Sequence, residues 1–243
     1  AGGDTACAFA NTAMQLAGQQ LIPESLAAVV RAMSAVRGLA AVEGGAVGPW
    51  KDCGYEGIVV KAISGIPISM EGHSATCAHF SPVGNVASAA CDLWSNESVQ
   101  NVRLLSGSAP AAFAESLAYD CRLMNTSLAQ GSEATLQQLF VDSDAPHSPQ
   151  AYVLTPAAAI RIAAAIVAEE TDYARTRAAA TTAVELIQEA LDSGALVPFA
   201  EPEARWFDRI AADLAELPVD EGELIEQTRA EYGDLYDAPS YGL

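Results

Sequence analysis

The stretch Gly48-Pro49-Trp50-Lys51-Asp52-Cys53-Gly54 decides the fold, because its glycine and proline end the apolar run Leu39–Val47. That run predicts a short buried strand, and the residues after Cys53 predict a helix from about Glu56 to Ile63. A second apolar run bounded by glycines, Gly65–Gly72, is typical of a parallel strand covered on both faces. Strand and helix therefore alternate here, which indicates an α/β arrangement.

The signals for strands stop beyond Gln130, and the rest of the chain is predicted to be helical. Thr155 as N-cap and Pro156 in the first turn begin a very long predicted helical stretch to about Asp192. Two more helices are expected at 203–217 and 220–232, separated by Pro218. We therefore divide the chain into a strand-and-helix part with metal-site loops, residues 1–130, and a helical C-terminal segment, residues 131–243.

The composition sets the class of protein. With 243 residues, 51% of them apolar, the chain can bury a sizeable core. The formal net charge of −19 argues against binding to nucleic acid or to anionic membranes. Five irregularly spaced cysteines favour a reducing compartment, so we expect a cytoplasmic protein. No uninterrupted apolar stretch has the length of a membrane helix, since Arg161 breaks the longest alanine-rich one.

Cys7 and Cys53 are the main candidates for chemistry. Each follows a short loop between a predicted strand and a predicted helix, and α/β folds gather such loops at one face. Two thiols there suggest ligands of one metal ion, and Zn²⁺ suits thiolates with carboxylates. For each cysteine taken alone, a buried structural role is the alternative.

A second cluster of possible ligands follows the next predicted strand. Glu71, His73, Cys77 and His79 lie within nine residues of one another. Metal ligation, lining of the same pocket and simple packing all remain open for Cys77 and His79. Cys91 and Cys121 fall inside helical patterns among apolar residues, where core packing is expected.

Several short sequence motifs point to a family. They are Gly3-Asp4-Thr5-Ala6-Cys7, Lys51-Asp52-Cys53-Gly54-Tyr55-Glu56, Met70-Glu71-Gly72, Thr76-Cys77-Ala78-His79, Trp94-Ser95-Asn96-Glu97-Ser98 and Leu117-Ala118-Tyr119-Asp120-Cys121. Together they resemble the methanol-activating subunit of methanol:corrinoid methyltransferase. The resemblance is specific up to about residue 130 and looser beyond it.

This resemblance implies a (β/α)₈ barrel of the TIM type whose zinc ion is held by two cysteines and one glutamate. The cysteines correspond to Cys7 and Cys53. The family's glutamate lies upstream of the first cysteine, so we expect this chain to be the C-terminal half of a longer protein. Otherwise Glu71 or His79 completes the site. The expected fold is thus the C-terminal part of the barrel followed by a long all-helical segment.

The resemblance also implies a reaction. The methyl group of methanol is transferred to the cobalt(I) of a corrinoid carried by a partner protein, with zinc stabilising the charge on the leaving oxygen. Asp4, Asp52 and Glu71 are the expected carboxylates for proton handling. We expect a homo-oligomer formed through the long amphipathic helices after residue 155, and packing of these helices under the barrel is the alternative.

Three other functions fit the sequence. A related zinc methyltransferase would act on a methylamine or a methyl thiol, because zinc dithiolates also activate thiols. A truncated subunit would keep its contacts and serve only in assembly. A plain α/β domain with buried cysteines is the third, and the number of matching words argues against it.

Overall fold

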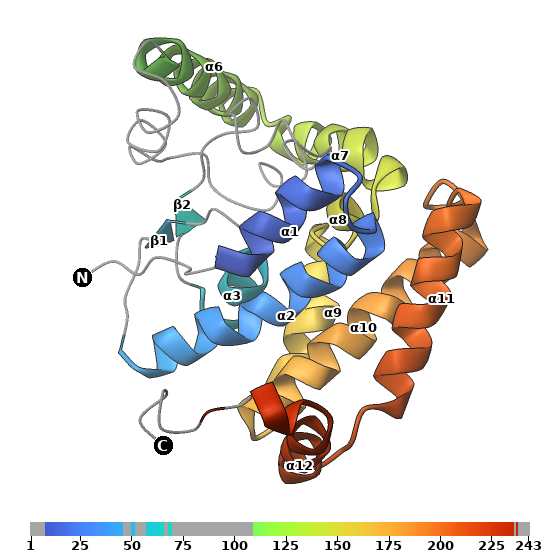
Figure 1. Cartoon of the computed structure of the whole chain (residues 1–243). Coiled ribbons are helices and arrows are strands. Elements are labelled where there is room, and N and C mark those ends of the chain that lie inside the picture. Colours follow the sequence, from blue (N-terminus) through green and yellow to red (C-terminus); the bar gives the residue numbers. More distant parts are fainter. Residues whose placement is uncertain are drawn as a thin grey trace.

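The computed structural model describes residues 8–45, 50–51, 57–65, 68–69, 109–235 and 237. These residues form an array of helices with one small parallel ribbon of two strands (Figure 1). In chain order the elements are α1 (Ala8–Gly18), α2 (Glu24–Glu43), β1 (Trp50–Lys51), α3 (Gly57–Ser64), β2 (Ile68–Ser69), α6 (Ala109–Ala129), α7 (Glu133–Asp144), the 3₁₀ turn η2 (Ala145–His147), α8 (Pro149–Tyr152), α9 (Pro156–Val167), α10 (Asp172–Ser193), α11 (Glu201–Glu216), α12 (Glu221–Tyr232) and the 3₁₀ turn η3 (Gly233–Leu235).

Helix α2 lies at the centre of this array. It packs against α1, α3, α8, α10 and α11, so its buried residues occupy several faces rather than one stripe. In the part of the chain that the structure describes, α2 is the one helix long and apolar enough to cross a bilayer, yet 67% of its apolar window is buried inside the protein. A helix that is buried on several faces needs apolar residues on all of them, and this explains the apolar composition of α2.

The main core is formed where α2, α3, α9 and α10 meet. Large aliphatic side chains fill it, among them Ile162 and Ile166 of α9 and Ile187 of α10, each with no exposed surface. Helices α2 and α10 pack against each other, and both bury small side chains in the main core, among them Ala35 and Ala183. Because the distance between packed helices depends on the side chains at the contact, small side chains permit close approach.

One charged side chain lies inside this core. Arg31 of α2 is 1% exposed, and its Nε donates a hydrogen bond to Oε1 of Gln150 at 3.0 Å. Gln150 belongs to α8 and is equally buried. Burial of a guanidinium is costly unless it is hydrogen-bonded, so this contact fixes the short helix α8 against α2.

The N-terminus of α2 is capped by a distant carboxylate. Pro23 occupies the N-cap position and offers no side-chain acceptor. Instead, Glu203 of α11 accepts hydrogen bonds from the backbone N–H of Glu24 at 3.2 Å and of Ser25 at 2.8 Å, and from the Ser25 hydroxyl at 2.5 Å. A carboxylate at this end of a helix accepts from backbone N–H groups that have no acceptor within the helix. Its negative charge also interacts favourably with the positive end of the helix dipole. We call these three hydrogen bonds the Glu203 clasp.

Glu24 lies beside the clasp and is half-buried. The Ser148 hydroxyl donates to its Oε2 at 3.0 Å. Burial raises the pKa of Glu24, the hydrogen bond from Ser148 lowers it, and the charge of Glu203 raises it further, with an upward net shift. The fold therefore disfavours the ionised form of this side chain.

The prediction of a (β/α)₈ barrel part is wrong for the described residues. Their strands comprise two residues each, and helices make up almost all of the remainder. The expected strand at Leu39–Val47 is also wrong over residues 39–43, because α2 continues to Glu43 and ends at Gly44. Ala40 and Ala41 have high helix propensity, and this outweighed the apolar run.

Other expectations are confirmed or need correction. Helices were correctly predicted near Glu56–Ile63, at 203–217 and at 220–232, and Thr155 caps α9 as expected through the N–H of Ala158. The predicted helical stretch to Asp192 comprises two helices, since α9 ends at Val167 and α10 begins at Asp172. Thr171 caps α10 by accepting from the N–H of Ala174, and this second cap was not recognised in the sequence.

The core is expected to depend strongly on Ile162. Replacing it with alanine removes a fully buried side chain and should lower the free energy of unfolding by about 2–5 kcal/mol. Ile160 lies on the same helix and is 62% exposed, so Ile160→Ala should change stability by no more than about 0.5 kcal/mol. Urea denaturation of both variants measures the difference. Equal losses would show that α9 does not bury the face described here.

Glu24→Gln should stabilise the protein at neutral pH. A raised pKa means that the folded state holds this proton more tightly, so stability falls as the pH rises from the ordinary value of 4.5 through the raised pKa. Glutamine cannot ionise and still accepts from Ser148, so its advantage should appear above this window and vanish below it. Thermal denaturation across pH 4–8 tests this. Glu221→Gln, also at the first position of a helix but exposed, is the control and should give no such gain.

Candidate functional site

Strands β1 and β2 form the one sheet in the described part of the chain, so their ends form its one described edge of this kind. β1 and β2 pair in parallel, with Trp50 opposite Ile68 and Lys51 opposite Ser69. Helix α3 connects them, which makes a β1–α3–β2 unit. Because the strands run the same way and in register, their carboxyl ends, Lys51 and Ser69, lie next to each other at one edge.

This edge is attached to the core through α3. Residues 57–60 of this helix are buried, and α3 packs against both α2 and α9. Ile58, Val59 and Val60 belong to the same cluster of buried side chains as Ile162. The position of the strand ends therefore depends on the packing of the whole helical core.

The sequence-predicted site residues all lie outside the described part of the chain: Asp4, Cys7, Asp52, Cys53 and Glu71, together with His73, Cys77, His79 and Cys91. Their neighbours in sequence are described. The first residue of α1 follows Cys7, and Asp52 and Cys53 occur between β1 and α3. Glu71 comes two residues after the end of β2. The zinc site therefore stays a prediction, with its flanking elements in place.

Helix α1, which begins directly after Cys7, is also anchored to α2. Met14 is fully buried in the main core, and Ala13 and Ala17 form a second buried cluster with Ala27 and Val30 of α2. All three elements that adjoin Cys7, Cys53 and Glu71 in the sequence are thus connected to the core, α1 through α2 and the two strands through α3.

The described residues themselves supply no alternative metal centre, since no three of their His, Cys, Asp or Glu side chains form a group that could hold an ion. Cys121, on α6, is half-buried rather than in the core, which corrects the expectation for this residue. Burial, together with the charge of Asp120, raises the pKa of its thiol. The neutral thiol is therefore favoured at Cys121, whereas a metal ligand must be a thiolate.

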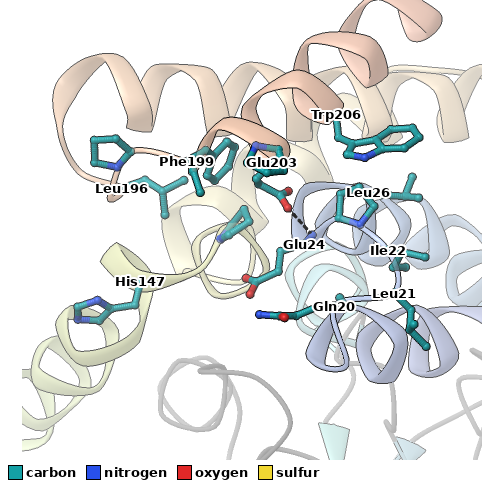
Figure 2. Close-up of a pocket in the computed structure, with 16 residues that line it drawn as sticks. Gln20, Leu21, Ile22, Glu24, Leu26, His147, Leu196, Phe199, Glu203 and Trp206 are labelled. Atoms are coloured by element: carbon teal, nitrogen blue, oxygen red, sulfur yellow. Dashed lines mark hydrogen bonds between the residues drawn. The ribbon is translucent and has the colours of Figure 1, made fainter.

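A groove of about 700 Å³ lies elsewhere, between the end of α1, the start of α2, η2 and α11 (Figure 2). Its lining combines apolar side chains with the carboxylates of Glu24 and Glu203 and with His147, which is exposed. No residue predicted as a metal ligand lines it. Sequence reasoning missed this groove, because Glu24 and Glu203 are 179 residues apart and no local pattern pairs them.

The comparisons with known proteins agree with the resemblance seen in the sequence. The family model described as the methanol-cobalamin methyltransferase B subunit matches residues 1–242. A methanol–corrinoid protein co-methyltransferase of Methanosarcina barkeri is 46% identical over 191 residues, which are 77% of this chain and 41% of that protein.

A solved structure is also similar to the chain. The crystal structure of the methanol:cobalamin methyltransferase complex MtaBC from Methanosarcina barkeri contains a chain that is 36% identical, with a TM-score of 0.84. The match covers 100% of this chain and 54% of that one. This chain therefore spans about two fifths to one half of the length of these relatives. Since the family model matches nearly every residue, the chain belongs to the methanol-cobalamin methyltransferase B subunit family.

Proposed function

We propose that this chain provides a zinc site for transfer of the methyl group of methanol to the cobalt(I) of a corrinoid on a partner protein. The observation that carries the proposal is the parallel pairing of β1 with β2 in a member of this family. Carboxyl ends of parallel strands are where α/β units present their ligand-binding residues. In the sequence, Cys53 follows one of these strand ends and Glu71 follows the other.

The sequence has few residues between Cys53 or Glu71 and the described strand ends. Cys53 follows Lys51 by two residues and Glu71 follows Ser69 by two residues, and Lys51 and Ser69 are register partners. Two residues span at most about 7 Å. Cys7 directly precedes Ala8, the first residue of α1, in the sequence.

The donor atoms fit the metal. Two thiolates together with a carboxylate form a ligand set that zinc accepts, while magnesium and calcium prefer oxygen alone. Zinc, when bound, would supply a Lewis acid for the oxygen of methanol, whose departure as hydroxide is otherwise unfavourable. In this proposal Cys7 and Cys53 are the thiolate ligands. Glu71 is a candidate both for the carboxylate ligand and for proton handling.

Proton handling requires a carboxylate near the zinc site. Asp52 is adjacent to Cys53, and Asp4 precedes Cys7 by three residues. A carboxylic acid beside the leaving oxygen would donate the proton that converts hydroxide into water, which is general acid catalysis. We assign this role to Asp4, Asp52 or Glu71.

The corrinoid protein is the partner in this proposal, because the similar solved structure is a methanol:cobalamin methyltransferase complex. A large cofactor on a second protein must reach the zinc site, which requires an open approach to the strand edge. We further propose that the protein acts in the cytoplasm and forms a homo-oligomer.

The test is methylation of cob(I)alamin by methanol, followed from the absorbance change of the corrinoid, with the zinc content measured on the same samples. Cys7→Ser and Cys53→Ser should each lower the rate by about a hundredfold or more and lower bound zinc. Cys121→Ser is the matched control and should change neither quantity. Methylamine and methyl thiol are tested as competing methyl donors, because a related methyltransferase would use one of them in place of methanol. Full rates in both Cys7 and Cys53 variants would contradict the proposal.

A further inference from the structure

Helices α11 and α12 bury few of their side chains completely. Of the side chains of α11 only Phe207 is buried, and α12 buries none. By contrast, α9 and α10 each bury at least five. Segments with few buried apolar contacts are the ones that open locally at low free-energy cost.

Apolar packing holds α11 to the main core through buried Phe207 and partly buried Ile210 and Leu214. Three specific contacts add to this packing. The ring of Phe207 meets Phe199 edge to face, with centroids 5.6 Å apart and planes at 77°. The Tyr173 hydroxyl of α10 donates to the carbonyl of Pro218, in the connection between α11 and α12. The third contact is the Glu203 clasp on the N-terminus of α2. In this contact a charged side chain joins α11 to the central helix α2.

The connection before α11 has the form of a hinge. Val197 is fixed, because its N–H donates to the carbonyl of Pro146 at 2.9 Å. Helix α11 begins at Glu201, and the three residues between, Pro198–Ala200, belong to no helix or strand. Rotation within this short segment would move α11 and α12 and break the Tyr173–Pro218 hydrogen bond and the apolar contacts of Ile210 and Leu214 with the core. It would leave the packing of α10 against α2 and α9 in place.

Electrostatics oppose the closed position as well as support it. The clasp brings the Glu203 carboxylate close to that of Glu24, and the two repel each other. The half-buried Glu24 has the Ser148 hydroxyl as its donor and no cation in any ion pair of the described residues. The closed position is therefore held by donors at the helix end against like-charge repulsion, which keeps its margin small.

We propose that α11 and α12 form an arm that opens about Pro198–Ala200, with the Glu203 clasp as the contact that keeps it closed. Opening dismantles the groove, because Pro202, Glu203 and Trp206 of the arm form one of its walls (Figure 2). It also frees the N–H groups of Glu24 and Ser25 at the N-terminus of α2. This device is independent of the proposed zinc chemistry.

Hydrogen–deuterium exchange of the full chain, read by mass spectrometry, tests the arm. In the unaltered protein, peptides of α11 and α12 should exchange much faster than those of α9 and α10. Glu203→Gln replaces charged hydrogen bonds by weaker ones and should accelerate exchange in both arm helices on the order of tenfold. The first turn of α2 should accelerate with them, while α9 and α10 stay unchanged.

Glu201→Gln is the matched control, because Glu201 lies on the same helix, is exposed and pairs only with Arg205 one turn away. It should leave exchange in the arm unaltered. Phe207→Leu loosens the arm at its other contact and should accelerate α11 and α12 without the direct loss of the clasp. Arm helices as protected as α10, unchanged exchange in Glu203→Gln, or equal acceleration of every helix would each overturn the proposal.

Discussion

The burial of α2 on several faces is the constraint on which the rest of the structure depends. A helix of 20 residues with this apolar content must be covered, and α1, α3, α8, α10 and α11 provide the cover. The two polar features of α2 then determine which elements can be its neighbours. Arg31 requires the buried acceptor on α8, and the uncapped N-terminus receives Glu203 from α11. Apolar burial supplies the stability, and these polar contacts select the arrangement.

The proposed site depends on the same core. The ribbon of β1 and β2 has only two residues in each strand, which is far too little to be stable alone. It is held in place because α3, between the strands, buries Ile58, Val59 and Val60 against α2 and α9. Damage to the helical core should therefore affect metal binding without touching a ligand.

Local patterns predicted a good part of the helical architecture. Thr155 followed by Pro156 fixed one helix start, and Pro218 separated the last two helices, since caps and prolines act within a few residues. An apolar run occurs both in strands and in buried helices, so it does not distinguish the two. Residues 39–43 were predicted as a strand and form the end of α2. The barrel inferred from resemblance is not what the described residues form.

The Glu203 clasp and the groove arise from residues far apart in the chain, which no local pattern pairs. Cys7, Cys53 and Glu71 were predicted as site residues from loop positions and resemblance, and they stay predictions.

The central claim is that two cysteines on separate loops hold one zinc ion beside the β1–β2 edge. X-ray absorption at the zinc edge of the zinc-loaded chain tests it most directly, because it counts sulfur ligands. The account predicts two sulfur atoms at about 2.3 Å with lighter ligands completing the shell, and one sulfur atom in Cys53→Ser. A shell of four sulfur atoms, or one without sulfur, would contradict it.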